Sequence, residues 1–273
     1  MTSVTCPLLI DTSVSHYLQA PTPIPAGYVW TSRTPAADYS WLAVTYGNGL
    51  FVAVACCDGG YYLVMTSPQG ITWTSRMSAQ YSNTQPSWQA VTYGNGLFVA
   101  VGFANEGKRV MTSPDGITWT SRNPSNDFKS WQAVTYGNGL FVAVGNWQGG
   151  DGKHERVMTS PDGITWTSRM NSIDRDWRGV TYGDGIFVAV AWEGYPEQIM
   201  TSPDGITWTT RYSPTKAQFS SVTYGKGIFV AVATYSYENR PKDYVSVITS
   251  PDGITWTSRT DNFGLWKYHV DPP

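Results

Sequence analysis

Cysteine is scarce in this 273-residue chain. There are three cysteines; Cys56 and Cys57 are neighbours, and Cys6 stands alone near the start. An odd number of cysteines without a repeated spacing excludes a disulfide framework. The stability of the fold must therefore come from packing.

Charged residues are also few, at 14% of the chain, and the formal net charge is −2. Such a balance argues against nucleic acid or an anionic membrane surface as the main partner, because both are bound through excess positive charge. The chain contains no long apolar run, and its first residues lack the basic and apolar segments of a signal peptide. We therefore expect no membrane insertion and no Sec export. The sequence does not specify the compartment, and it is compatible with a place in a virion or with an extracellular location reached without Sec export.

Aromatic residues, in contrast, are abundant, with 13 Trp and 17 Tyr among them. A chain of this composition has ample apolar surface to bury and is not disordered. The aromatic residues mark a repeat: six tryptophans that are each followed by threonine lie 43, 46, 47, 42 and 48 residues apart. A period of roughly 40 to 50 residues is the length of one β-propeller blade.

Each repeat contains four short apolar or β-branched runs separated by Gly, Asn, Pro and Asp, a pattern typical of strands. The first run is Trp-x-Ala-Val-Thr-Tyr, and Gly-Asn-Gly or a close variant joins it to the second as a tight hairpin with positive φ angles. The third run ends in Met-Thr-Ser or Ile-Thr-Ser. A Ser-Pro-Asp-Gly turn follows, and the fourth strand is predicted as Ile-Thr-Trp-Thr-Ser-Arg.

The number of blades follows from the segments left outside the complete repeats. These repeats span approximately 41–76, 88–122, 131–169, 177–211 and 219–259. Residues 1–33 contain strand-like segments, and Trp266 follows Arg259 by seven residues. We therefore predict an all-β fold with a single domain over 1–273: a six-bladed β-propeller of four-stranded antiparallel blades, with 1–33 and 260–273 forming the split sixth blade. A five-bladed propeller with loose tails is the alternative.

The segment SPDGITW, which begins at Ser113, Ser160, Ser202 and Ser250, resembles the Asp-box turn of sialidases and several other β-propeller proteins. The common form has one more residue between Asp and Gly, and the first copy here has Gln69 in place of the aspartate. In those families the turn is structural and lies on the face away from the active site. The resemblance therefore implies a fold and no particular chemistry.

Function is expected where the repeats differ, because variable loops on a rigid scaffold are the usual binding segments. The loops between second and third strands and the links between blades vary, and both belong to one face of the predicted propeller. An aromatic ring beside hydroxyl, amide and carboxylate groups suits a sugar, whereas simple packing on a neighbouring blade is the alternative. The candidate binding residues are Tyr62, Phe103, Trp147, Trp192, Tyr195, Tyr235 and Tyr237.

An enzyme is not expected. A sialidase-like site needs a cluster of arginines that binds a carboxylate, and the six arginines of the fourth strands are excluded because they repeat at equivalent framework positions. A metal site at His154 and Glu155 lacks a convincing ligand spacing, and no cofactor motif occurs. The remaining arginines are Arg109, Arg156, Arg175, Arg178 and Arg240, of which Arg178 alone lies in a predicted inner strand.

The sequence therefore favours a non-enzymatic, lectin-like module that binds a glycan or glycoprotein surface through several related loops, whose multivalency would raise avidity. The alternative is a structural or protein-docking propeller, such as a component of a virion, a phage fibre or an adhesin, that contacts other protein subunits. A glycoside hydrolase is the weakest of the three interpretations.

Removal of residues 1–33 tests the split sixth blade. We expect a sharp fall in the melting temperature, because the deletion removes two of the predicted strands and opens a sheet edge. Thermal denaturation followed by circular dichroism measures this effect. An unchanged melting temperature would contradict closure by the two ends of the chain.

Overall fold

The computed structural model describes residues 31–56, 63–79, 87–103, 109–125, 130–146, 155–234 and 245–259. The chain divides into two compact units, residues 1–33 and 34–273, and every strand named below belongs to the second unit. The regular structure of the described residues is entirely β-strand. No helix long and apolar enough to cross a membrane occurs in these ranges.

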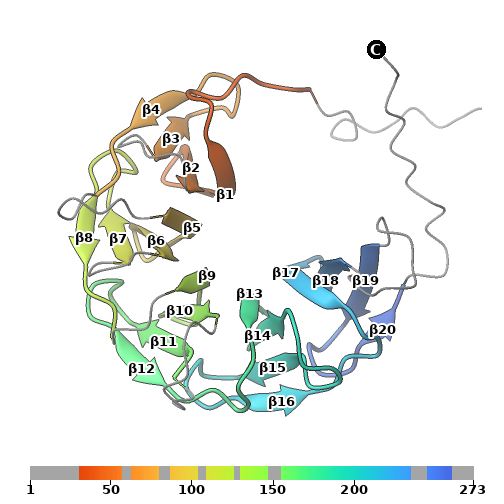
Figure 1. Cartoon of the computed structure of the whole chain (residues 1–273). Helices are drawn as coiled ribbons and strands as arrows, with labels where there is room; N and C mark the ends of the chain where they lie inside the picture. Colours follow the sequence, from red (N-terminus) through yellow and green to blue (C-terminus); the bar gives the residue numbers. More distant parts are fainter. Residues whose placement is uncertain are drawn as a thin grey trace, which may run out of the picture. The chain divides into compact units, whose positions relative to one another are not determined.

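Five antiparallel sheets of four strands follow one another along the chain, and in each sheet the strands pair in sequence order (Figure 1). The first two sheets contain β1 (Ser40–Gly47), β2 (Leu50–Cys56), β3 (Val64–Ser67), β4 (Thr74–Arg76), β5 (Ser87–Gly94), β6 (Leu97–Phe103), β7 (Val110–Ser113) and β8 (Thr120–Arg122). The third and fourth contain β9 (Trp131–Gly137), β10 (Leu140–Gly145), β11 (Val157–Ser160), β12 (Thr167–Arg169), β13 (Trp177–Gly183), β14 (Ile186–Ala191), β15 (Ile199–Ser202) and β16 (Thr209–Arg211). The fifth contains β17 (Gln218–Gly225), β18 (Ile228–Thr234), β19 (Val245–Ser250) and β20 (Thr257–Ser258).

The up-and-down order of the strands separates two ends of every sheet. The hairpin between the first two strands and the turn between the last two lie at one end, which we call the constant rim. The loop between second and third strands and the link to the next sheet lie at the other end, which we call the variable rim. The separation of constant and variable segments predicted from the repeats is therefore confirmed for the described strands.

The hairpins of the constant rim have the predicted conformation. In the first sheet, Asn48 and Gly49 connect β1 to β2 with φ angles of 47° and 75°. Two successive positive φ angles define a turn whose twist matches that of the strands it joins. Asp184 and Lys226 take the place of the asparagine in the last two sheets, at 47° and 51°.

The fourth strands are shorter than predicted. In the third sheet, only Thr167–Arg169 pairs with β11. The preceding Ile164 and Thr165 instead donate their backbone N–H groups to one carboxylate oxygen of Asp162, both at 2.8 Å, and the Ser160 hydroxyl donates to the same oxygen at 2.9 Å. The Ile-Thr segment therefore extends the turn, because its amides bind the aspartate and not a neighbouring strand.

These hydrogen bonds lower the pKa of the turn aspartates. For Asp162, the largest cause is the backbone N–H of Thr165; desolvation opposes it, and the N–H of Ile164 and the hydroxyl of Ser160 add to it. The pKa values of Asp204 and Asp252 are lowered with the same order of causes. For Asp115, desolvation is the largest single cause and raises the pKa, but the hydrogen bonds together outweigh it and the pKa is lowered.

Successive sheets pack face to face. Val142 and Val144 of β10, for example, form one buried cluster with Trp177, Val180 and Phe187 of the fourth sheet. All five side chains are at least nine-tenths buried, and each contributes about 2 kcal/mol through burial of its apolar surface. The repeated tryptophan at the head of an inner strand is thus part of the core at this position.

A tyrosine ring fits over a glycine at each of these interfaces. A Cβ atom on Gly137 of β9 would lie 2.1 Å from Cγ of Tyr182 on β13. No side chain is accommodated at that distance, so the glycine allows the inner strands of neighbouring sheets to approach. The same relation holds for the pairs Gly47–Tyr93, Gly94–Tyr136 and Gly183–Tyr224.

The outward faces of the first and fifth sheets differ from these interfaces. Val44 of β1 is 59% exposed, whereas the equivalent valines of the other four sheets are 7–8% exposed. A Cβ atom on Gly225 of β17 would meet no heavy atom within 4 Å. The described residues thus form five blades; the segments predicted to build a sixth, 1–33 and 260–273, lie almost wholly outside them, and the sixth blade stays a prediction.

Gly137→Ala tests the contact between tyrosine and glycine. We expect a loss of about 1–3 kcal/mol in unfolding free energy, because the new methyl group must displace the Tyr182 ring. The matched control is Gly225→Ala at the equivalent position, where space is open. Urea denaturation at equilibrium measures both variants, and equal midpoints would contradict the packing described here.

Gln69→Asp and Asp162→Asn test the turn. The first variant should gain about 1 kcal/mol at pH 7, because it supplies the carboxylate that the other turns have, and the second should lose a similar amount. A carboxyl with a lowered folded-state pKa stabilises the fold above its ordinary pKa of 3.8, and this stabilisation is lost as the pH falls through the lower folded value. Both effects should therefore shrink in acid-range urea titrations below pH 3.8; pH-independent differences would show that the carboxylate is not responsible.

Candidate functional site

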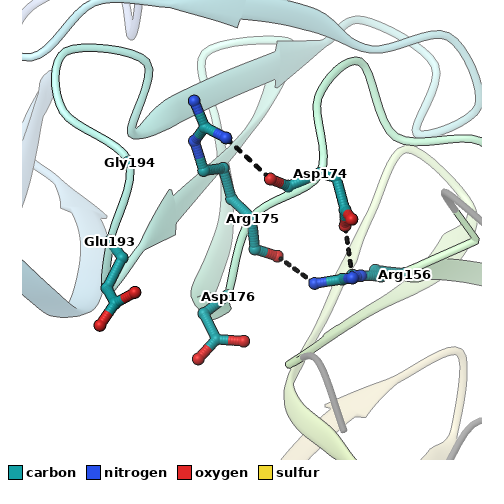
Figure 2. Close-up of a pocket in the computed structure, with 6 residues that line it drawn as sticks. All are labelled: Arg156, Asp174, Arg175, Asp176, Glu193 and Gly194. Carbon is teal, nitrogen blue, oxygen red and sulfur yellow. Dashed lines mark hydrogen bonds and ion pairs between the residues drawn. The ribbon is translucent and has the colours of Figure 1, made fainter. Parts of the chain in front are cut away.

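A cavity of about 300 Å³ opens at the variable rim between the third and fourth sheets (Figure 2). Three segments supply its walls: the residue before β11, the end of the link from β12 to β13, and the loop after β14. The link and the loop differ between the repeats, whereas Arg156 corresponds to Arg109, which precedes the same Val-Met-Thr-Ser segment in the second sheet. The lining residues are Arg156, Asp174, Arg175, Asp176, Glu193 and Gly194.

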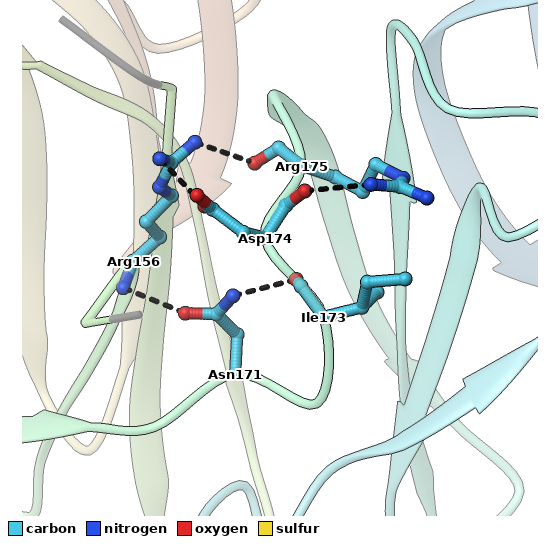
Figure 3. A network of polar contacts seen from close by, with 5 residues as sticks. All are labelled: Arg156, Asn171, Ile173, Asp174 and Arg175. Atoms are coloured by element: carbon cyan, nitrogen blue, oxygen red, sulfur yellow. Dashed lines mark hydrogen bonds and ion pairs between the residues drawn. The ribbon is translucent and has the colours of Figure 1, made fainter. Parts of the chain in front are cut away.

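Arg156 holds the link between β12 and β13 in place (Figure 3). Its side chain is only 4% exposed and forms an ion pair with Asp174 at 2.5 Å. Its guanidinium also donates to the Arg175 carbonyl at 3.2 Å, and its backbone N–H donates to the Asn171 side chain at 3.0 Å. Asn171 in turn donates to the Ile173 carbonyl at 2.6 Å. A buried charge is tolerated only with partners of this kind, so the arginine fixes the backbone of the cavity wall.

Arg175 connects this link to the loop after β14. Its guanidinium forms an ion pair with Glu197 at 3.2 Å and donates to the Asp174 carbonyl at 2.9 Å. A Cβ atom on Gly194 would lie 1.8 Å from Nε of Arg175, and Gly194 has a φ of 100°. Both the space and the backbone conformation therefore require glycine at this point of the wall.

Arg178 and Trp192 meet beside the cavity. The guanidinium carbon of Arg178 lies 5.4 Å from the centre of the Trp192 ring, a cation–π contact. The same guanidinium lies 3.5 Å from the Asp176 carboxylate and donates to Gln132 of the third sheet at 3.3 Å. One face of the Trp192 ring is thus occupied by a side chain of the protein itself.

The charges of the site do not cancel. Three arginines, Arg156, Arg175 and Arg178, each contact a carboxylate. The fourth carboxylate of the group, that of Glu193, is exposed and forms no ion pair or hydrogen bond with another described residue. The lining and its ion-pair partners therefore carry one negative charge in excess.

Tyr195 adjoins this site, and a second exposed tyrosine, Tyr212, lies on a segment that contacts the same loop. Tyr195 follows the lining residue Gly194 and is 48% exposed. Tyr212, just after β16, is 66% exposed. The backbone N–H of Ser213 donates to the Pro196 carbonyl at 2.9 Å, so the segments that carry the two tyrosines lie against each other.

The aromatic residues predicted as binding residues only partly coincide with this site. Trp192 and Tyr195 adjoin the cavity, but neither lines it. Phe103, in the second sheet, is partly buried and bridges to Ser130, away from the cavity lining. The other four predicted residues, Tyr62, Trp147, Tyr235 and Tyr237, lie outside the described residues.

The acidic part of the site was not predicted from the sequence. Arg156, Arg175 and Arg178 were considered there, and the structure brings these three together with carboxylates that were not. A usable signal was present, because Asp174, Asp176, Glu193 and Glu197 all lie in the link before β13 and the loop after β14, two segments that differ between the repeats. Arg109 is buried outside the cavity lining, and Arg240 lies outside the described residues.

Metal binding finds no geometric basis in the described ranges. No three His, Cys, Asp or Glu side chains in those ranges are grouped so that they could hold a metal ion. His154, one of the two residues weighed as a metal ligand, lies outside them.

Comparisons with known proteins bear on the fold alone. No family model matches the chain, and no curated protein matches it. A solved structure of YCF48 bound to D1 peptide is similar, with a TM-score of 0.50 and 14% sequence identity, over 81% of this chain and 81% of that chain. A computationally designed protein, Ika8, has a TM-score of 0.48 and 12% identity, over 80% of this chain and 73% of that chain. Together with the five repeated four-stranded sheets, the YCF48 likeness shows that this chain has a β-propeller fold.

Proposed function

We propose that the protein is a non-enzymatic recognition module of the Asp-box β-propeller kind, and that the variable rim of its fourth sheet binds a segment of a partner protein. The observation that carries the proposal is the cavity at that rim, which is lined mainly by two segments that differ between the repeats and is held by ion pairs. The four Ser-Pro-Asp-Gly turns with bonded aspartates support the Asp-box assignment.

The composition around the cavity supports protein binding. Tyrosine, tryptophan and arginine are the residues that contribute most at the centres of protein interfaces. Arg175 lines the cavity, Trp192 and Tyr195 adjoin it, and the exposed Tyr212 lies on a segment that contacts the loop of Tyr195. The walls are held by Arg156 and Arg175, so little ordering is needed when a ligand binds. The similar YCF48 structure contains a bound peptide, which makes a peptide ligand a reasonable candidate for a propeller of this kind.

The pairing of the arginines supports a binding role over glycoside hydrolysis. A sialidase-like site needs guanidinium groups that are free to bind the substrate's carboxylate. Here Arg156, Arg175 and Arg178 are each engaged by a carboxylate of the chain itself. A substrate carboxylate would have to displace these partners from the guanidinium groups.

Glycan binding is the second candidate. Tyr195 is an exposed ring two residues from the carboxylate of Glu193, and a sugar offers an apolar face and hydroxyl groups to such a pair. Trp192 is less suited, because Arg178 occupies one face of its ring. A lectin would also use comparable loops of other blades, whose aromatic residues lie mostly outside the described ranges.

A parallel selection separates the two candidates. The full chain is used to select binders from a displayed library of random peptides and is applied, labelled, to a glycan array. We expect specific peptides to be enriched, and Tyr195→Ala to weaken their binding at least tenfold, about 1.4 kcal/mol or more. Ile206→Ala is the control, because this side chain is exposed on the constant rim of the same sheet. Affinities are measured by titration calorimetry.

Three outcomes are informative. Peptide binding that depends on Tyr195 and not on Ile206 supports the proposal. A glycan signal without peptide enrichment favours the second candidate. Peptides that bind both variants as tightly as the parent protein, or no enrichment at all, would place recognition elsewhere and contradict the proposal.

A further inference from the structure

We infer that the cavity between the third and fourth sheets takes a basic side chain, lysine or arginine, from the partner protein; this inference rests on the proposed function and names the chemistry of its ligand. Three observations support it: the charge of the site, the position of the unengaged carboxylate, and the aromatic residue beside it.

The charge balance disfavours an acidic ligand. A carboxylate or phosphate group would need one of the three guanidiniums as its partner, and each already contacts a carboxylate. For the nearly buried Arg156, exchange of the partner would leave Asp174 without its counter-ion. A cation requires no such exchange, because Glu193 has no partner among the described residues.

The carboxylates are placed to receive a cation. Figure 2 shows the carboxylate groups of Asp176 and Glu193 on the same side of the cavity, opposite the guanidinium group of Arg175. They come from two different segments, the link before β13 and the loop after β14. Asp176 already contacts Arg178, so an ammonium or guanidinium group between these segments would take Glu193 as its main partner, with Asp176 adding negative charge nearby.

The same loop already holds one basic side chain in this manner. The Arg178 guanidinium lies over the Trp192 ring and also contacts the Asp176 carboxylate. The loop continues with Glu193, Gly194 and the exposed Tyr195, which offers a second carboxylate and a second ring to the outside. Lysine and arginine suit such a pair, because the apolar stem packs on the ring while the charged end reaches the carboxylate.

The size of the cavity is consistent with one side chain. Its volume of about 300 Å³ lies at the lower end of the range for ligand pockets. A single long side chain with its flanking backbone fits this volume better than a large cofactor does. Specificity for a longer segment would then come from Tyr195 beside the cavity and from Tyr212 on the segment that contacts its loop.

Peptides selected in the previous experiment provide the probes. Each lysine or arginine is replaced in turn by norleucine, which retains the apolar stem without the charge, and by glutamate. We expect one basic position at which replacement by norleucine weakens peptide binding at least fivefold. Replacement by glutamate at the same position should weaken binding further. In the Glu193→Gln variant, replacement of this basic residue by norleucine should change the affinity less than twofold. The preference, meaning the ratio of the affinities for the basic and the norleucine peptide, should also fall in the parent protein when 0.5 M salt is added.

Asp184→Asn is the matched control. It removes one negative charge from the constant rim of the same sheet, at a hairpin position where the first three sheets have asparagine. This variant should retain the full preference for the basic side chain. Melting temperatures of both variants, compared with the parent, verify that each is folded.

The outcomes distinguish this inference from the proposed function. The inference would be overturned if peptide binding depended on Tyr195 but not on any lysine or arginine of the peptide. It would also be overturned if the Glu193→Gln variant kept the preference for the basic peptide. Either result would leave the proposed function standing. The same holds if Asp184→Asn abolishes the preference as Glu193→Gln does, because the effect would then reflect overall charge. Failure of every peptide to bind would overturn both.

Discussion

The described four-stranded sheets of this protein pack on one another through apolar faces, and the structure depends on burying these faces between neighbouring sheets. The valines of one sheet pack on the tryptophan and phenylalanine of the next, and a tyrosine ring covers a glycine of the preceding inner strand. This contact allows almost no variation, because a single methyl group on Gly137 would overlap the Tyr182 ring. The near-identity of the repeats follows from this requirement, since each of the second, third and fourth sheets has to fit a neighbour of the same shape on both of its faces.

The constant and variable rims follow from this constraint. At the constant rim, short hairpins and aspartate turns satisfy their own backbone groups, so the same residues recur in each blade. At the variable rim, the link before β13 and the loop after β14 differ in sequence from their counterparts in the other repeats. There the chain replaces repeated packing with ion pairs, and Arg156 and Arg175 hold segments that the repeat leaves undefined. A rigid site thus forms on a scaffold whose blades are otherwise nearly alike.

Prediction from the sequence succeeded for hairpins, which depend on residues close in the sequence. It was incomplete for contacts between residues that are distant in the sequence. The hairpin at Asn48 and Gly49 was predictable, because two residues with positive φ angles connect adjacent strands. The fourth strands were predicted too long, because the pattern Ile-Thr-Trp suits a strand as well as a turn whose amides bind Asp162. At the candidate site, the aromatic pattern led to Trp192, but its contact with Arg178 depends on how a loop folds over the adjacent inner strand.

The sequence alone determined the pattern of strands and turns in each blade. Turns and strands depend on residues that are close in the sequence, and these residues recur in every repeat. It also identified the segments that differ between repeats, and the cavity for which we propose a binding role is lined mainly by two of them. Tertiary structure decided which charges meet. Arg156 and Asp174 are separated by two strands, the turn between them and part of a link, and the fold brings their side chains into contact. A charge pair of this kind depends on distance in space, which no local spacing in the sequence records.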